Sequence, residues 1–313
     1  MPRLHDLISA AGYTTGEPVA VGLQYGDAPP ILATHGPPLT AMTLTYAASL
    51  SKQVTAACAA LLARRGDLDP GSPLAHWLPH LPAWARAVRV RHLLHHTAAL
   101  PADADLDASA HTPDRTSASV LQALARIPAL TRRPGTEHTY SNAGYVCLAA
   151  VVEQVAGTPL PAFARTHLFT PLGLTSTRFW PGPDPAPPGA APLHPRHPAP
   201  LSLGDGGLWT TLTDLLRWSQ ALNDDDLALT PMLQTPGRLD DGTPLDYAWG
   251  MAVRTHAGHT VYRHGGGWIG LRALQARIPE LGLSVALIAT RDHTERRLPL
   301  MDSLLTASLR GEL

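Results

Sequence analysis

The chain has 313 residues, of which 44% are hydrophobic and 16% are charged, and its formal net charge is −1. A chain of this length and apolar content can bury a large core, so we expect one large domain or two intimately joined domains. The balanced charge, without a long run of one sign, provides no basic surface for a phosphate backbone and excludes a typical nucleic-acid-binding protein.

The first residues and the cysteines bear on the cellular compartment. Residues 1–6 contain no continuous apolar stretch of the kind that a signal peptide needs, and nowhere do about 18 apolar residues follow one another. Cys58 and Cys147 each lie in an apolar helical pattern, which favours buried reduced thiols over a disulfide. We therefore expect a soluble, cytoplasmic protein without a membrane partner.

Strand patterns gather at the two ends of the chain. Residues 18–25 and 31–34 are apolar runs separated by a proline-containing turn, which predicts a hairpin. Near the other end, residues 260–264, 271–278 and 282–289 have the composition of three more strands.

Helical patterns occupy the middle of the chain. The clearest runs from Ser49 to Arg65 and stops at Gly66, as the C′ preference for glycine favours. Two more are predicted at 143–155 and 213–222, the second with an N-cap at Thr213-Asp214. Residues 180–200 carry nine prolines and predict a loop, either a mobile flap over a site or a surface insertion.

Lys52 is the only lysine among the 24 lysine and arginine residues, and it stands three positions after Ser49. Arginine stays charged in proteins, whereas a buried lysine can lose its proton and act as a base. Side chains three apart on a helix are neighbours, so the amine can take the proton of the serine hydroxyl. Backbone N–H groups at a helix start at Ser49 would hold the developing oxyanion. The pattern predicts nucleophilic acyl transfer, and chance placement of a single lysine is the alternative.

Tyr140-Ser141-Asn142 is the only Tyr-x-Asn among the seven tyrosines. It follows Pro134-Gly135, a helix breaker, so we expect it in a turn that can aim a phenol and an amide into a cleft. The structural alternative is a packed tyrosine ring and an asparagine that caps a helix starting at Ala143.

A run of three glycines follows His264 at the end of a predicted strand. Glycine in a strand marks the close approach of another backbone or of a ligand, and acyl transfer needs a further N–H donor for the oxyanion. A simple hairpin turn is the alternative reading.

Ser49-x-x-Lys52, Tyr140-x-Asn142 and the His264-Gly-Gly segment together resemble the serine β-lactamase and penicillin-binding-protein superfamily, and more narrowly its class C β-lactamase branch. That branch also contains esterases, D-alanyl-D-alanine carboxypeptidases and D-aminopeptidases. The similarity extends from about Pro18 to Arg291. It includes four connecting segments, residues 91–97, 134–135, 171–174 and 206–210.

The resemblance implies a role for each matching residue. The nucleophile, the general base and the phenol that assists proton transfer would be Ser49, Lys52 and Tyr140. Substrate contacts would come from Asn142, His264, Gly265, Gly266 and Gly267, with the N–H groups of the nucleophile and the last glycine forming the oxyanion hole. The implied substrate is a small-molecule ester, amide or lactam, and no cofactor or metal is implied.

The family fold is α+β, with an antiparallel sheet made by both chain ends, flanked by helices, and an inserted, mostly helical region. This agrees with the distribution of the predicted strands. We expect a sheet domain from residues 1–70 and 240–313 and a mostly helical domain from residues 71–239, with the proline-rich loop 180–200 in the latter.

Two departures from the family pattern carry consequences. Ala98-Ala99 stands where the family usually has Ser-Gly, which predicts a stiffer loop. His264 stands where penicillin-recognising members commonly have a lysine. An unperturbed histidine loses its charge near pH 6.5, so we expect carboxylate ligands to bind more tightly as the pH falls towards about 5.5. At neutral pH the site should prefer neutral esters to penicillins.

Alternative functions are weighed on the same residues. Two histidine groups, 92/95/96 and 256/259/264, have spacings that invite a zinc site, but neither has a carboxylate or cysteine to complete it. A non-catalytic binding or scaffold relative is the alternative outside the enzymes. Among enzymes, ester hydrolysis leads over amide hydrolysis of D-amino acid compounds and over β-lactam hydrolysis.

Overall fold

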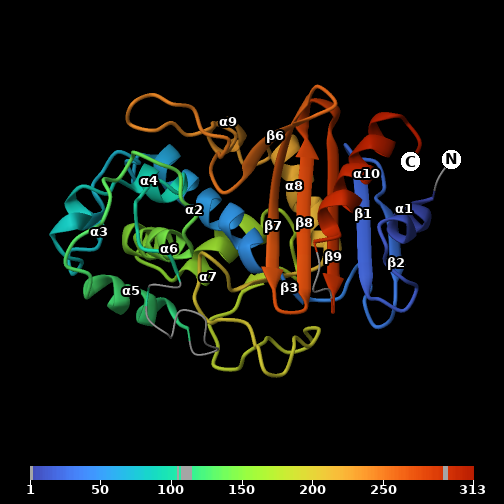
Figure 1. The fold of residues 1–313 in the computed structure, drawn as a ribbon, viewed down its shortest axis with the longest axis horizontal. Coiled ribbons are helices and arrows are strands. Elements are labelled where there is room, and N and C mark those ends of the chain that lie inside the picture. The colour runs from blue at the N-terminus through green and yellow to red at the C-terminus, as the bar shows by residue number, and fades with distance from the viewer. Residues whose placement is uncertain (1–2, 104–105, 107–114, 292–294) are drawn as a thin grey trace.

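The structure is a computed structural model that describes residues 3–103, 106, 115–291 and 295–313. Its main layer is an antiparallel sheet in the order β2-β1-β9-β8-β7-β6 (Figure 1). These strands are β1 (Val19–Tyr25), β2 (Ile31–His35), β6 (Ala252–His256), β7 (His259–Trp268), β8 (Leu271–Ile278) and β9 (Leu283–Thr290). The predicted α+β class is confirmed, because β1 from the first end of the chain pairs with β9 from the other.

The predicted hairpin of β1 and β2 is confirmed, but two strands differ from the prediction. β6 was not predicted, and β7 continues through its glycines to Trp268 instead of ending at His264. Glycine has a low strand propensity, so the sequence pattern ends early. In the fold the ladder to β8 continues, with Gly266 opposite Ala273.

The side chains of the sheet alternate between two apolar layers, as the two-residue period of a strand requires. Val19 and Val21 pack with α1 (Leu4–Ala10) and α10 (Arg297–Leu309) on one face. Ala20, between them in the sequence, joins the cluster that contains the buried residues of α8 (Leu212–Asn223) on the other face.

The remaining helices lie to one side of the sheet, opposite the two chain ends (Figure 1). Among them is α2 (Ser51–Arg65), in which every residue from Ser51 to Leu62 is buried. The others are η1 (Ala48–Leu50), α3 (Leu74–Trp77), η2 (Ala83–Arg86), α4 (Val90–Leu94), α5 (Ser117–Ala125), α6 (Asn142–Ala156), α7 (Leu160–Ala164), η4 (Arg165–Phe169) and α9 (Thr230–Leu233). A smaller sheet contains β3 (Thr45–Tyr46), β5 (Leu208–Thr210) and β4 (Arg178–Phe179), and η5 (Pro279–Leu281) links β8 to β9.

The two regions interpenetrate at the predicted domain limits. α8 falls within residues 71–239, yet it packs against β1, β8 and β9 of the sheet. α2 falls within residues 1–70, yet it packs against α6 and α7 of the helical region. One continuous apolar cluster includes residues of both helices. The apolar core is continuous across both predicted domain limits. The division of the chain into these two residue ranges stays a prediction.

Three helix starts differ from the predictions. α2 begins at Ser51, and Ser49 lies in the 3₁₀ turn η1 before it. Thr211, instead of Thr213, caps α8, because its Oγ1 accepts the N–H of Asp214 at 3.1 Å. α6 is capped by Ser141, whose Oγ accepts the N–H of Gly144 at 3.1 Å. The adjacent asparagine side chain is therefore available for another contact.

The proline-rich loop is a packed wall of the molecule. The N–H of Ala191 donates to the carbonyl of Leu44 at 2.7 Å, and Trp268 Nε1 donates to the carbonyl of His197 at 2.8 Å. Leu193 packs against the small apolar cluster around Tyr46. These contacts fix the loop to the segment before β3 and to the end of β7.

Both cysteines are buried and free, as predicted. Among the described residues, no single helix is long and apolar enough to cross a membrane. One pair, α6 with residues Leu160–Phe169, meets the criterion by length and composition together but is bent by 73°. Most residues of α6 are buried in the protein core.

Ala99 lies where the family usually has glycine, and its φ of +53° is in the left-handed region. That conformation costs a non-glycine residue roughly 1–2 kcal/mol, because Cβ approaches the backbone carbonyl. Ala98 is also buried, but its φ is not in this region. The alanine at position 99 therefore has a strained backbone conformation.

We expect both Ala98→Gly and Ala99→Gly to lower the free energy of unfolding. The loss at residue 99 should be smaller than the loss at residue 98 by at least about 1 kcal/mol. Both changes remove a buried methyl group and add unfolded-state entropy, but only the first relieves strain. Urea unfolding of the two variants measures the difference. Equal losses would show that the backbone at residue 99 is not strained.

Candidate active site

The predicted nucleophile lies in a strained turn between β3 and α2. Ser49 is the middle residue of η1, and the residue before it, Ala48, has a φ of +48°. Strained backbone in a well-packed frame is a recurrent property of reactive positions. The turn holds the partly exposed serine above the buried start of α2.

The amine of Lys52 lies in a fully buried position with three oxygen neighbours. It is 3.2 Å from Ser49 Oγ, 2.7 Å from Asn142 Oδ1 and 2.8 Å from the carbonyl oxygen of Asp205. The side chain has no exposed surface. The predicted pair of serine and lysine is thus within hydrogen-bond reach.

These contacts fit the geometry of a base. A neutral amine has two N–H donors and one lone pair, whereas an ammonium has three donors. Two carbonyl oxygens, which only accept, take the two donors of the neutral form. When the amine is neutral, its lone pair is left towards Ser49 Oγ, where it can receive the hydroxyl proton.

Tyr140 lies beside this amine, and its ring centre is 4.9 Å from Lys52 Nζ. The tyrosine is 43% exposed, so its ring forms a wall of the site and not part of the core. His96 packs against it with 4.3 Å between ring centres, and His96 Nδ1 accepts the N–H of Ser141 at 3.2 Å. These two contacts of His96 hold the predicted turn in place.

The close approach predicted for the glycine run occurs at Gly266. A Cβ on this residue would lie 2.2 Å from the carbonyl oxygen of Ala47, in the turn that leads to the nucleophile. A Cβ on Gly265 would instead point towards the Arg297 side chain of α10, on the other side of the strand. Only glycine at 266 lets β7 reach the turn of Ser49.

His264 is buried, and burial is the main reason that its pKa is lowered to about 3, with the nearby Lys52 amine contributing. Its Nδ1 lies 2.8 Å from the carbonyl of Gly265, which can only accept, so that nitrogen carries the proton of the neutral ring. The expectation of an unperturbed histidine that charges near pH 6.5 is therefore wrong. Burial keeps the ring neutral throughout the range from about pH 5 to 8.

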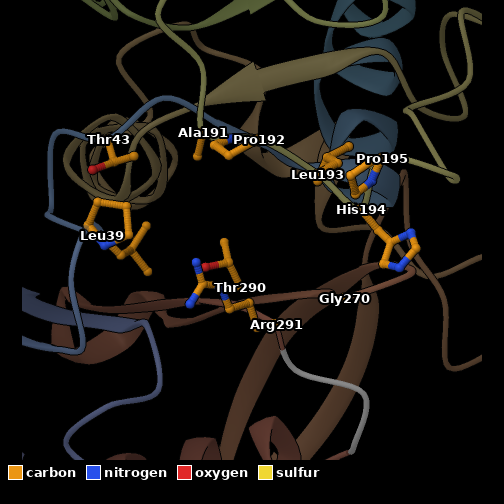
Figure 2. A pocket seen from close by; sticks show the side chains of 11 residues that line it. Leu39, Thr43, Ala191, Pro192, Leu193, His194, Pro195, Gly270, Thr290 and Arg291 are labelled. Atoms are coloured by element: carbon orange, nitrogen blue, oxygen red, sulfur yellow. The ribbon is translucent and has the colours of Figure 1, made fainter.

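A pocket of about 80 Å³ opens beside the serine. Of the predicted site residues it is lined by Ser49, Asn142 and Gly267, whereas His264 lies next to Tyr140, 6.2 Å away between ring centres. A larger pocket of about 330 Å³ lies elsewhere, between the proline-rich loop and the ends of β8 and β9 (Figure 2). Its walls are mostly apolar and contain no predicted site residue, so we place the chemistry in the smaller pocket.

The sequence reasoning missed four polar residues of this smaller pocket. They are Tyr46, Asp103, Arg115 and Asp205. Asp205 directly precedes the glycine pair of a connecting segment, which is a signal that could have found it. The others stand in no periodic pattern or motif, and only the fold brings them to the pocket.

The histidines of the zinc alternative have other partners. His256 Nε2 lies 3.0 Å from Thr306 Oγ1, His259 contacts Glu280, and His95 Nδ1 lies 3.3 Å from the carbonyl of Tyr247. Within the described ranges, no group of three or more histidine, cysteine or acidic side chains is placed to hold a metal ion.

Comparison with known proteins defines the family. The family model described as Beta-lactamase matches residues 8–307. The chain belongs to the beta-lactamase family of serine hydrolases. Penicillin-binding protein 4* of Bacillus subtilis is 29% identical over 282 residues, which are 78% of this chain and 60% of that protein. A D-aminopeptidase of Cereibacter sphaeroides is 28% identical over 208 residues, which are 61% of this chain and 39% of the relative. The chain thus spans only part of the length of these relatives.

Solved structures show the same fold. A D-stereospecific amidohydrolase from Streptomyces superposes with a TM-score of 0.82 at 21% identity, covering 96% of this chain and 97% of the other. The D-amino acid amidase from Ochrobactrum anthropi superposes with a TM-score of 0.82 at 21% identity, covering 99% of each chain. The β-lactamase/transpeptidase-like fold expected from the sequence is confirmed.

Gly266→Ala is expected to lower the free energy of unfolding by about 1–3 kcal/mol, the usual cost of forcing extra volume into a packed site. The added methyl group meets backbone, which cannot rotate away. Gly265→Ala is the matched control, because its Cβ would be no closer than 3.5 Å to a flexible arginine side chain. Thermal and urea unfolding compare the two. A Gly266→Ala protein as stable as the control would show that β7 does not press on the turn.

Because His264 stays neutral, we expect no charge-dependent gain in carboxylate binding between pH 8 and pH 5.5, a range that lies well above its pKa of about 3. The test is equilibrium binding to Ser49→Ala of paired ligands that differ only in a carboxylate or its methyl ester. Parallel profiles are expected for the two. Progressive tightening of the carboxylate alone would show that His264 gains a proton in this range.

Proposed function

We propose that this chain hydrolyses uncharged esters of small acyl groups through an acyl-enzyme on Ser49. Ser49 Oγ attacks the carbonyl carbon while its proton passes to Lys52 Nζ. The N–H groups of Ser49 and Gly267 hold the oxyanion, and Lys52, assisted by the Tyr140 phenol, returns the proton to the leaving alkoxide. Water then attacks the acyl carbon by the reverse proton path and releases the acid.

The observation that carries the acyl-transfer chemistry is the contact set of the buried Lys52 amine. Two carbonyl acceptors and the serine hydroxyl surround it at 2.7–3.2 Å. A purely structural scaffold has no need to bury its single lysine against a serine, because an amine removed from water is costly to retain. This supports an enzyme over the non-catalytic alternative.

The preference for uncharged esters rests on the charges around the pocket. Among the described residues that line it, Arg115 is the one cation, and its guanidinium is already paired with Asp205. His264, in the position where a cationic lysine would hold a carboxylate, is neutral. A substrate carboxylate would be desolvated without an opposite charge, which disfavours penicillins and carboxyl-terminal peptides.

A second candidate is hydrolysis of amides of amino acids with a free amine. Asp103 lines the pocket with a carboxylate that is 18% exposed, and an ammonium group on the acyl side would be attracted to it. The names of the D-aminopeptidase and D-amino acid amidase relatives agree with this chemistry.

A cytoplasmic location stays a prediction.

Fluorophosphonate is expected to label Ser49, and an uncharged p-nitrophenyl ester should be hydrolysed with a kcat/KM at least tenfold above that of the same ester bearing an acyl-side carboxylate. Lys52→Arg keeps the charge but cannot accept the proton, so it should lower acylation at least a hundredfold. Intact-protein mass and steady-state rates measure both.

The Ser49→Ala protein controls for background hydrolysis and should keep the wild-type melting temperature. Alanine amides of D and L configuration test the second candidate in the same assay. Faster turnover of the D-amide than of the uncharged ester would replace the ester proposal. Faster acylation by penicillin than by the ester would overturn the charge argument.

A further inference from the structure

A buried guanidinium, that of Arg115, is paired with Asp205, which provides one acceptor for the Lys52 amine. The same guanidinium lies near Asp103, which contacts Asn142, the other acceptor. Arg115 is 4% exposed and contacts the side chains of Asp205 and Ser202. Its second terminal nitrogen lies 4.0 Å from Asp103 Oδ1. All three charged residues line the pocket, and their side chains take no part in the proposed reaction.

Each carboxylate is connected to one acceptor of the lysine. Asp103 Oδ2 accepts from Asn142 Nδ2 at 2.5 Å, and its Oδ1 accepts the N–H of Ala143 at 3.3 Å. This fixes which end of the asparagine amide faces Lys52, because the carboxylate can only accept and must take the NH₂ end. Asp205 presents its own backbone carbonyl to Lys52 while Arg115 holds its side chain.

We propose that Arg115 is a positioning residue for the catalytic lysine. By holding Asp103 and Asp205 together, it keeps both acceptors of the Lys52 protons in place. Its positive charge also offsets the negative charge of the two carboxylates. This inference rests on the acyl-enzyme chemistry proposed at Ser49. It does not depend on which ester or amide is the substrate.

The charge balance decides how the site responds to a change at Arg115. Without the guanidinium, two carboxylates remain near the Lys52 amine and favour its charged form, which cannot accept the serine proton. Removing one carboxylate has the opposite effect. The other titratable groups that face the amine stay unchanged in these variants; they are His96 and His264, with Tyr140 and Tyr145.

A structural alternative exists, because the Arg115 side chain also contacts Ser202 Oγ and ties the segment after the proline-rich loop to this region. A residue with that role alone would affect the melting temperature and the overall rate. It would not move the pH at which acylation is half-maximal. The direction of the pH shift therefore separates the two roles.

The experiment measures the rate at which fluorophosphonate modifies Ser49, by intact-protein mass, from pH 5 to pH 10. Arg115→Gln is expected to move the midpoint of the profile upward by about one pH unit. On the rising part of the profile the labelling rate should then be about tenfold lower than in the wild type, and at high pH it should return to the wild-type rate. Asp103→Asn should move the midpoint downward. Arg310→Gln, which removes an exposed arginine at the end of α10, is the matched charge control and should leave the midpoint unchanged.

Arg115→Lys provides a second test if the glutamine variant does not fold. It keeps the charge but loses the fork that reaches two carboxylates, so the midpoint should stay while the plateau rate falls. Midpoints of Arg115→Gln and Asp103→Asn that stay at the wild-type value, with wild-type labelling intact, would overturn this inference and leave the proposed function standing. Failure to label Ser49 in the wild type would overturn both.

Discussion

The structure of the site depends on the burial of one amine. Lys52 has no exposed surface, and a buried amine is tolerated only where its donors find acceptors. Those acceptors come from the start of α6 and from the segment that leads into β5, both distant from α2 in the sequence. Satisfying one side chain therefore requires three segments of the chain to converge, and the place where they converge is where the serine lies.

Backbone-to-backbone contact then sets the position of the serine. Gly266 of β7 touches the carbonyl of Ala47, and Gly250 lies so close to the backbone of Lys52 that a Cβ there would be 2.7 Å from its carbonyl oxygen. These two glycines hold η1 and α2 between the sheet and the segment before β6. A frame of this kind can maintain the positive φ of Ala48, because neighbouring backbone blocks the relaxed conformations.

Burial also determines which groups near the site carry charge. The imidazoles of His96 and His264 both have lowered pKa values, chiefly because the charged ring would lose its water. Arg115 keeps its charge at a similar depth, since it is paired with Asp205. The site therefore combines neutral imidazoles near the lysine with an arginine in the pocket whose charge is paired with Asp205.

The sequence by itself determined the elements with a local cause. The spacing of Ser49 and Lys52, the turn at Tyr140 and the strand periods depend on neighbours along the chain, so they could be predicted, as could the family. The tertiary structure alone decided the rest. It brought Asp103 and Arg115 to the lysine, continued β7 through its glycines and suppressed the charge of His264. Burial and long-range pairing are properties of the packed fold, and no pattern of neighbouring residues specifies them.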